Sequence, residues 1–267
     1  MTPAFPAPAW LVGCGNMAGA MVDGWRAAGI DFSGVTVIRP SGTPVVGVRT
    51  VTAYPAAAPR FVMLGFKPQK LDEVSPGLAP HVEDDTILVS MLAGVGAASL
   101  RDRFPHARAI VRVMPNLPVA QRKGVTALYA ADNDDDAWAQ VAALMTVLGL
   151  APWCAHETAF SAIGAVAGSG PAYVARFAGA LATGGERLGL DADLAMAIAV
   201  QTLVGTGAMT EASGEGMGDL AQRVASPKGT TEQGLAVLDG DDGLQSLVDR
   251  MLAAAIRRGE EMAAAAR

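Results

Sequence analysis

The first 156 residues contain short apolar runs separated by segments rich in glycine, proline and polar residues. Such runs predict buried strands, because a strand covered on both faces of a sheet has apolar side chains on both. Two segments, 17–28 and 137–148, instead have apolar residues at helical spacing. This pattern predicts an α/β domain with a mostly parallel sheet. Its strands are expected at residues 9–12, 35–38, 60–64, 86–91 and 109–113, with a candidate edge strand at 125–130.

Beyond this region the pattern becomes helical, and no strand signal remains. The sequence therefore predicts two domains, residues 1–156 and residues 157–267, and the second is all-α. Alanine, glycine, leucine and methionine fill many of its positions, which permits close helix packing and favours dimerisation. Helices are expected at residues 158–188, 192–212, 219–225, 230–238 and 243–266.

Composition and charge argue against several classes of function. Of 267 residues, 51% are hydrophobic and 17% charged, and the net charge of −6 argues against nucleic-acid binding. The two cysteines, Cys14 and Cys154, form no metal-binding spacing, so no metal site is expected and a reducing cytoplasm is favoured. Residues 1–8 are expected to be a disordered lead without signal-peptide character. Segment 159–185 is interrupted by polar residues, so a buried helix or subunit interface is favoured over a membrane span.

A glycine turn lies between the first strand and the first helix, at residues 13–18 (GCGNMA). Gly13 permits the tight turn, Gly15 allows backbone to approach a pyrophosphate, and Ala18 lets the helix pack on its strand. The free N–H groups at the helix N-terminus then face the pyrophosphate. The turn predicts a Rossmann-like dinucleotide-binding domain, although alone it also fits a glycine-rich connection in another α/β protein.

The end of the second strand indicates which cofactor is bound. Arg39 stands where an acidic residue would bind the ribose hydroxyls of NAD, and Ser41 follows in a polar segment. A guanidinium suits a 2′-phosphate, so NADP(H) is expected, with NAD(H) still open. The other interpretation of Arg39 is a solvated charge at a strand end. Residues 40–60 are rich in proline and show no helical period, so a turn or loop replaces the usual second helix.

Several further motifs, taken in order, resemble the pyrroline-5-carboxylate reductase family along nearly the whole chain. Besides the glycine turn they are KPQ at 67–69, SMLAG at 90–94, RVMPN at 112–116, GSGPAY at 168–173 and VASPKGTT at 224–231. The resemblance implies reduction of the cyclic imine 1-pyrroline-5-carboxylate to L-proline with NAD(P)H. It also implies a homodimer formed through the helical domain, often assembled into a ring of dimers.

The resemblance also assigns roles to residues. It places Asn16 and Met17 at the pyrophosphate, and it lines the nicotinamide half with Lys67, Pro68, Ala93 and Asn116. It makes residues 226–231 the substrate loop, in which Ser226, Gly229 and Thr230 belong to the carboxylate site and the Thr231 hydroxyl reaches the ring nitrogen. Lys228 departs from the pattern, because the family usually has glycine there. The shortened segment after Arg39 and a missing His-Pro pair near residues 214–217 are further departures.

The chemistry agrees with these residues. An imine can enter already protonated, so the protein need not supply a strong general acid, and catalysis depends on positioning. His81, His106 and His156 lie outside the motifs, and Thr231 is the expected catalytic residue. Two alternatives remain open. One is a related imine or β-hydroxyacid oxidoreductase, although the segment 158–188 lacks the lysine such dehydrogenases carry. The other is a non-catalytic NADP-binding sensor, which would need no substrate loop.

Overall fold

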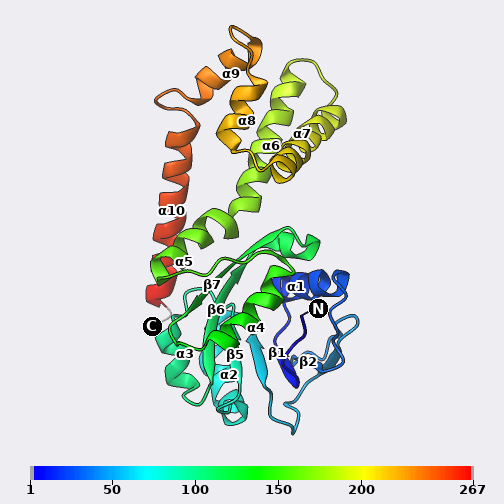
Figure 1. Ribbon diagram of the computed structural model, residues 1–267, viewed down its shortest axis with the longest axis vertical. Coiled ribbons are helices and arrows are strands. Elements are labelled where there is room, and N and C mark those ends of the chain that lie inside the picture. Colours follow the sequence, from blue (N-terminus) through cyan, green and yellow to red (C-terminus); the bar gives the residue numbers. More distant parts are fainter. Residues whose placement is uncertain (1–2, 266–267) are drawn as a thin grey trace. The chain divides into compact units, whose positions relative to one another are not determined.

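The computed structural model describes residues 3–265 and divides into two compact units. The first unit runs to Ser169 and resumes at Ala255, and the second comprises Gly170–Ala254. The first contains an eight-stranded sheet with the strand order β3-β2-β1-β4-β5-β6-β7-β8 (Figure 1). All neighbouring strands are parallel except β6 and β7, which are antiparallel. The strands are Ala9–Val12, Val35–Ile38, Arg49–Val51, Phe61–Leu64, Ile87–Ser90, Ala109–Pro115, Gly124–Ala130 and Gly149–Leu150.

The mostly parallel sheet is confirmed, but two of its strands were not expected. The predicted loop at residues 40–60 is wrong in part, because β3 pairs with β2 in the register Thr36↔Arg49. The short strand β8 pairs with β7 at the other edge. Both elements are too short for apolar periodicity to reveal them, and they form only because a neighbouring strand offers free backbone groups.

Helices cover both faces of the sheet, and successive strand residues face opposite cores. Leu11 belongs to the core that includes α1 (Asn16–Ala27) and α4 (Asp135–Thr146), whereas Trp10 and Val12 belong to the core that includes α2 and α3. The remaining helical elements of this part are α2 (Leu71–Leu78), α3 (Ala97–Arg103) and the 3-10 turns Pro68–Lys70, Ala79–His81 and Leu117–Gln121.

The N-terminal segment is part of the first core. Phe5 is buried, and its ring contacts the rings of Trp25, Phe32 and Phe61 at centroid distances of 5.0, 5.7 and 5.4 Å. The expected disordered lead is therefore wrong for residues 3–8, while residues 1–2 lie outside the described residues. Trp25 also donates from its indole Nε1 to the Leu144 carbonyl at 2.8 Å, which joins α1 to α4.

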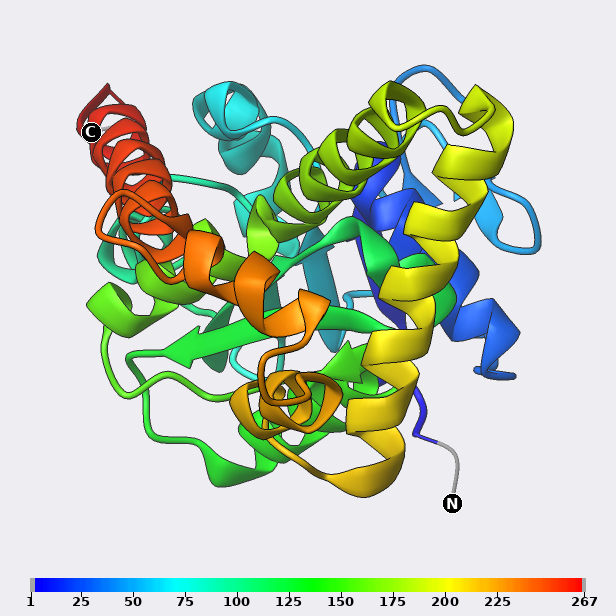
Figure 2. The same cartoon turned by 90° about the horizontal axis from the view of Figure 1, so that it is seen from above.

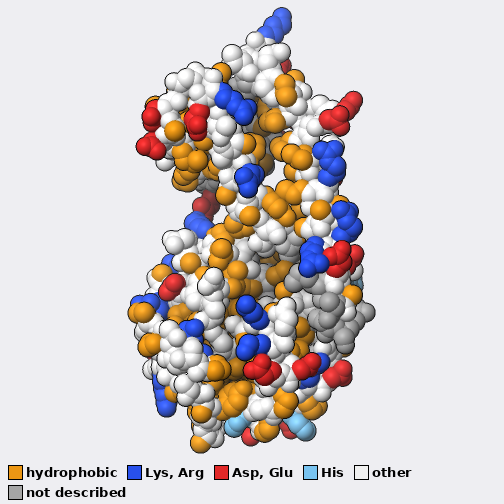
Figure 3. All heavy atoms as spheres, turned by 180° about the vertical axis from the view of Figure 1, so that it is seen from behind, with side chains coloured by type: hydrophobic (Ala, Val, Ile, Leu, Met, Phe, Trp, Pro, Cys, Tyr) orange, Lys and Arg blue, Asp and Glu red, His pale blue; other side chains and the backbone are white. Residues whose placement is uncertain are grey.

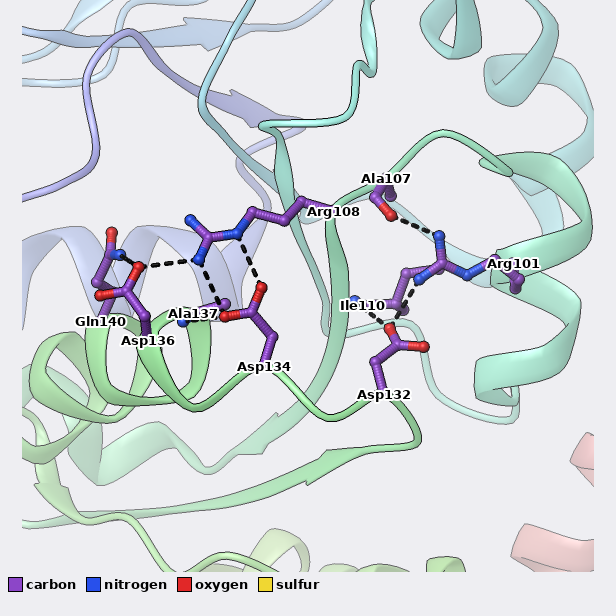
Figure 4. Close-up of polar contacts among 9 residues, drawn as sticks. All are labelled: Arg101, Ala107, Arg108, Ile110, Asp132, Asp134, Asp136, Ala137 and Gln140. Carbon is purple, nitrogen blue, oxygen red and sulfur yellow. Dashed lines mark hydrogen bonds and ion pairs between the residues drawn. The ribbon is translucent and has the colours of Figure 1, made fainter.

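The acidic run at residues 132–136 caps α4, and two arginines pair with three of its four carboxylates (Figure 4). Asp134 accepts a hydrogen bond from the Ala137 N–H at 2.9 Å and pairs with Arg108 at 2.8 Å. Asp132 pairs with Arg101 at 2.7 Å. The expectation of a helix-capping loop is confirmed, because carboxylates at a helix N-terminus satisfy its free N–H groups.

The second unit is helical, as expected. Its helices are α6 (Gly170–Arg187), α7 (Ala192–Ser213), α8 (Met217–Val224), α9 (Thr230–Leu238) and the first part of α10 (Leu244–Ala265). Small side chains, Ala182 from α6 with Ala195 and Ala199 from α7, form its buried cluster. The single helix expected at residues 158–188 is wrong. The chain there forms α5 (Glu157–Ile163) and a π-helical turn (Gly164–Gly168), both in the first unit, before α6 begins.

Large apolar side chains remain exposed on this unit. Helix α7 is the yellow helix at the right of Figure 2, and Figure 3 shows hydrophobic side chains at the surface of this unit. By length and composition α7 is also apolar enough to cross a membrane. A partner chain that covered this surface would bury the same side chains. The exposed set on α7 comprises Leu194, Met196, Ile198, Val200, Val204 and Met209.

Candidate active site

Four parallel strands end at one edge of the sheet. The registers Val12↔Leu64 and Leu64↔Ser90 align the carboxyl ends of β1, β4 and β5, and β6 runs past Ser90↔Arg112 to Pro115, so the segments that follow these strands lie along one lip. In parallel sheets ligands bind outside this edge. The structure thus brings together the glycine turn and the strand-end segments 65–68, 91–94 and 113–116, as the sequence predicted.

The glycine turn is shaped by its neighbours. Gly13 has φ +81°, and a Cβ there would lie 2.9 Å from the Phe66 nitrogen and 3.0 Å from the Gly65 carbonyl group. Gly15 is the N-cap of α1, and a Cβ there would meet no atom within 4 Å. No side chain caps this helix, so the N–H groups at Asn16 and Met17 face the open side of the turn. The turn therefore offers an anion site that is open to a ligand.

Arg39 and Ser41 follow β2 beside this turn. The Arg39 N–H donates to the Val51 carbonyl at 3.0 Å, so the unexpected strand β3 holds the backbone of this segment. Burial raises the pKa of the Cys14 thiol, and the positive charge of Arg39 acts in the opposite direction. The Gly13 N–H donates to the Ile38 carbonyl at 2.8 Å, which places the residue before Arg39 beside the glycine turn. Ser41 is exposed, and its Oγ accepts from the Thr43 hydroxyl at 3.0 Å.

The residues expected along the nicotinamide half of the lip differ in their exposure. Lys67 and Ala93 are exposed at their strand ends, and Pro68 begins a 3-10 turn. Asn116 is buried instead, at 6% exposure. Its Oδ1 accepts from the Val125 N–H at 2.8 Å, and its Nδ2 donates to the Ala167 carbonyl at 2.9 Å. Protein groups therefore already engage the Asn116 amide.

The predicted substrate loop lies in the second unit and leads into α9. The Gly229 N–H donates to the Ser226 carbonyl at 2.9 Å, and a Cβ on Gly229 would lie 2.3 Å from the Ser226 Oγ. Gly229 is the N-cap of α9, and no side chain caps this helix. The N–H groups at Thr230 and Thr231 are therefore the donors available to an anion. The Thr231 side chain is half-buried, and Ser226 and Thr230 are exposed.

Lys228 adopts a backbone conformation that favours glycine. Its φ is +58°, and its N–H donates to the Glu232 Oε2 at 2.7 Å. This explains why the family pattern has glycine at this position: the turn needs a left-handed residue there. The lysine keeps the turn and adds a positive charge beside the loop.

Two of the three histidines contact neighbouring side chains outside the motifs. His81 packs against the rings of Trp10 and Tyr54, and exposed His106 lies 3.7 Å from Asp84. Across the described residues, no group of three His, Cys, Asp or Glu side chains could hold a metal ion. The residue pair that sequence reasoning missed is Arg112 and Glu157, joined at 2.8 Å. A charged residue inside the apolar run 109–113 signals a buried partner, but sequence alone does not identify it.

The fold and the lip define a two-domain, dinucleotide-dependent oxidoreductase. A family model described as pyrroline-5-carboxylate reductase dimerisation matches residues 157–262. The pyrroline-5-carboxylate reductase of Pseudomonas aeruginosa is 34% identical over 262 residues, which cover 95% of this chain and 96% of that protein. A solved pyrroline-5-carboxylate reductase from Coxiella burnetii has a TM-score of 0.89 at 31% identity, covering 96% of this chain and 98% of its own. The chain belongs to the pyrroline-5-carboxylate reductase family, and its second unit falls within the dimerisation region of that family.

Proposed function

We propose that this chain uses NADPH to reduce the cyclic imine 1-pyrroline-5-carboxylate to L-proline. The observation that carries the proposal is family membership across both units, since relatives with this name match 94–95% of the chain. Residues 1–156 would bind the cofactor, and residues 157–267 would dimerise and bind the substrate.

The residues at the lip fit a dinucleotide. The glycine turn has no room for a side chain at Gly13 and open space at Gly15, so backbone can approach a pyrophosphate. Asn16 and Met17 would contact the same group. Arg39 and Ser41 would hold the 2′-phosphate of NADP(H), and NAD(H) would lose that contact. Residues Lys67, Pro68, Ala93 and Asn116 would line the nicotinamide half. When bound, the reduced nicotinamide supplies the hydride.

The substrate loop binds and orients the imine. Hydride adds to the carbon of the C=N bond, and the nitrogen keeps the proton with which the iminium enters, giving the secondary amine of proline. The N–H groups at Thr230 and Thr231 hold the carboxylate, while Ser226 and Gly229 shape the turn because the Gly229 N–H is already bonded to Ser226. The Thr231 hydroxyl orients the ring nitrogen. The reaction therefore depends on placement of two reactants, which can lower a barrier by about 7–11 kcal/mol.

The proposal includes a homo-oligomeric assembly and a cytoplasmic location. The exposed apolar face of the second unit would be covered by a second copy, and dimers would assemble into a ring. Cys14 and Cys154 are both free and buried, which fits the reducing cytoplasm. A dimer interface also accounts for the apolar character of α7 without a membrane.

The test follows NADPH absorbance with purified protein and the pyrroline carboxylate, beside hydroxy acids with NADP⁺. Turnover of the imine supports the proposal. Oxidation of a hydroxy acid would favour the related dehydrogenase, and NADPH binding without turnover would favour the sensor. Thr231→Val keeps the side-chain shape and removes the hydroxyl, so kcat should fall by about 100-fold while the Kd for NADPH stays unchanged. Thr231→Ser should restore most of the rate. Wild-type kinetics in Thr231→Val would remove the hydroxyl from the mechanism.

A further inference from the structure

Three alternate residues at the end of β6 contact one segment of the chain. Arg112, Met114 and Asn116 occupy alternate positions, and alternate residues of an extended strand face the same side. The segment they contact comprises residues 157–168, which form α5 and the π-helical turn. Both elements belong to the first unit, and the second unit begins two residues later.

The first contact is the Arg112–Glu157 ion pair. Arg112 is buried at 8% exposure, its Nη1 lies 2.8 Å from the Glu157 Oε1, and its guanidinium stands 4.5 Å from the Phe160 ring centroid. The same Glu157 oxygen accepts from the Ala97 N–H at 3.3 Å, at the start of α3. A buried guanidinium without its partner is costly, so the ion pair favours this position of Glu157, whose side chain is 46% exposed.

The other two contacts hold the π-helical turn. A Cβ on Gly164 would lie 2.2 Å from the Met114 Sδ, so Met114 and Gly164 are packed as closely as glycine permits. The Asn116 Nδ2 donates to the Ala167 carbonyl at 2.9 Å. The Val125 N–H bonds the Asn116 Oδ1, which aims the Nδ2 at Ala167. π-helical turns are rare, and they occur frequently at functional sites.

We propose that Arg112, Met114 and Asn116 anchor residues 157–168 to the sheet. These contacts would fix the position of the segment that leads into the helical unit. Asn116 also belongs to the nicotinamide lip, and the helical unit carries the loop at 226–231. Asn116 therefore ties the proposed nicotinamide site to the segment from which the helical unit starts. Arg112 and Glu157 are positioning residues in this account, which rests on the proposed function. Their loss should lower the rate of the chemical step rather than cofactor binding.

The experiment compares Glu157→Ala with Glu157→Gln in the full-length protein. The alanine removes both hydrogen bonds of the Glu157 oxygen, whereas glutamine keeps an oxygen that accepts them. Asp135→Ala is the matched control, because Asp135 is also an acidic first-turn residue of a helix in the first unit. The measurements are kcat, KM for the imine, the Kd for NADPH, and hydrogen exchange of residues 157–168.

Misplacement of reactants by about 1 Å can cost about 100-fold in rate. Glu157→Ala should therefore lower kcat by about tenfold to 100-fold, with the Kd for NADPH within about twofold of the wild type. It should also speed exchange over residues 157–168. Glu157→Gln should recover most of kcat, and Asp135→Ala should match the wild type. A wild-type kcat for Glu157→Ala, or an equal loss in Asp135→Ala, overturns the proposal.

A second pair of variants covers the case in which Glu157→Ala does not fold. Gly164→Ala should lower kcat because its Cβ needs the space that Met114 fills, and adding Met114→Ala should restore part of the loss. If the double variant recovers none of the lost kcat, the proposed anchoring of residues 157–168 is refuted. If the wild type binds NADPH but does not reduce the imine, the proposed function fails by itself. Hydrogen exchange then tests the anchoring contacts by themselves. Unchanged exchange in Gly164→Ala refutes the anchoring of residues 157–168, and faster exchange over these residues supports it.

Discussion

The glycine turn allows folding and cofactor binding to be separated by two similar substitutions. Gly13→Ala places a Cβ 2.9 Å from the Phe66 nitrogen and 3.0 Å from the Gly65 carbonyl carbon and oxygen. These are backbone atoms and cannot swing aside as a side chain would. The residue also has φ +81°, where an alanine costs about 1–2 kcal/mol. Crowding in a packed site adds about 1–3 kcal/mol. The sum predicts a loss of about 2–5 kcal/mol in the free energy of unfolding.

Gly15→Ala is the matched control for the same loop. Gly15 has an ordinary φ of −82°, and its Cβ would meet nothing within 4 Å. As an N-cap substitution it should cost less than about 1 kcal/mol. Its Cβ would nevertheless stand where a pyrophosphate approaches the backbone, so the Kd for NADPH should rise by about tenfold or more.

Urea unfolding at one fixed protein concentration, combined with NADPH titration, tests both variants. For an m-value of about 2–3 kcal/mol/M, Gly13→Ala should lower the midpoint by about 0.7–2.5 M. Gly15→Ala should leave the midpoint nearly unchanged and weaken binding. If Gly13→Ala unfolds at the wild-type midpoint, the backbone of Gly65 and Phe66 does not crowd a Cβ at residue 13. If Gly15→Ala binds NADPH as the wild type does, the pyrophosphate does not approach at this turn.

Two further substitutions test other local features. Lys228→Gly relieves the left-handed φ of +58° and should raise the free energy of unfolding by about 1 kcal/mol, which corresponds to a rise of about 2–4 °C in Tm. Lys228→Ala removes only the charge and should raise Tm by less. Asp134→Ala removes the cap of α4 and the Arg108 pair and should cost about 1 kcal/mol at neutral pH, whereas Asp135→Ala should cost little. Hydrogen bonds from the Ala137 N–H and Arg108 lower the pKa of Asp134, so this contribution is present above the usual aspartate range. It should disappear as the pH falls through the lowered pKa, and unfolding curves at several pH values should show the wild type and Asp134→Ala converging in acid. An equal Tm for Lys228→Gly and the wild type, or a gap that widens in acid for Asp134→Ala, would contradict these expectations.

The local pattern of the chain predicted most elements of the fold. The apolar runs at 9–12 and 35–38 are strands with those bounds, and the helix over 230–238 begins and ends as expected. These features are readable because a buried strand or an amphipathic helix satisfies its backbone hydrogen bonds and buries its side chains through nearby residues. The glycine turn and the helix-capping carboxylates were readable for the same reason, since each acts within a few residues.

Tertiary structure decided the contacts between distant residues. The strand β3 exists because β2 offers an edge, and Phe5 is ordered because Trp25 and Phe61 bury its ring. Arg112 could be recognised as a buried charge, but its partner Glu157 lies 45 residues away. The break between α5 and α6 falls at Ser169, where Gly168, Gly170 and Pro171 disfavour a continuous α-helix.

Local sequence patterns predict the order and type of the elements and the residues at the strand ends. The hydrogen-bond partners of those residues across the sheet follow from the tertiary structure. Asn116 is an example: its place at a strand end predicts a cofactor contact, and the fold adds the Val125 N–H and the Ala167 carbonyl as partners of its amide. The physical reason is that periodicity records burial along one element, while hydrogen-bond partners across elements depend on the sheet order and on how the chain returns to it.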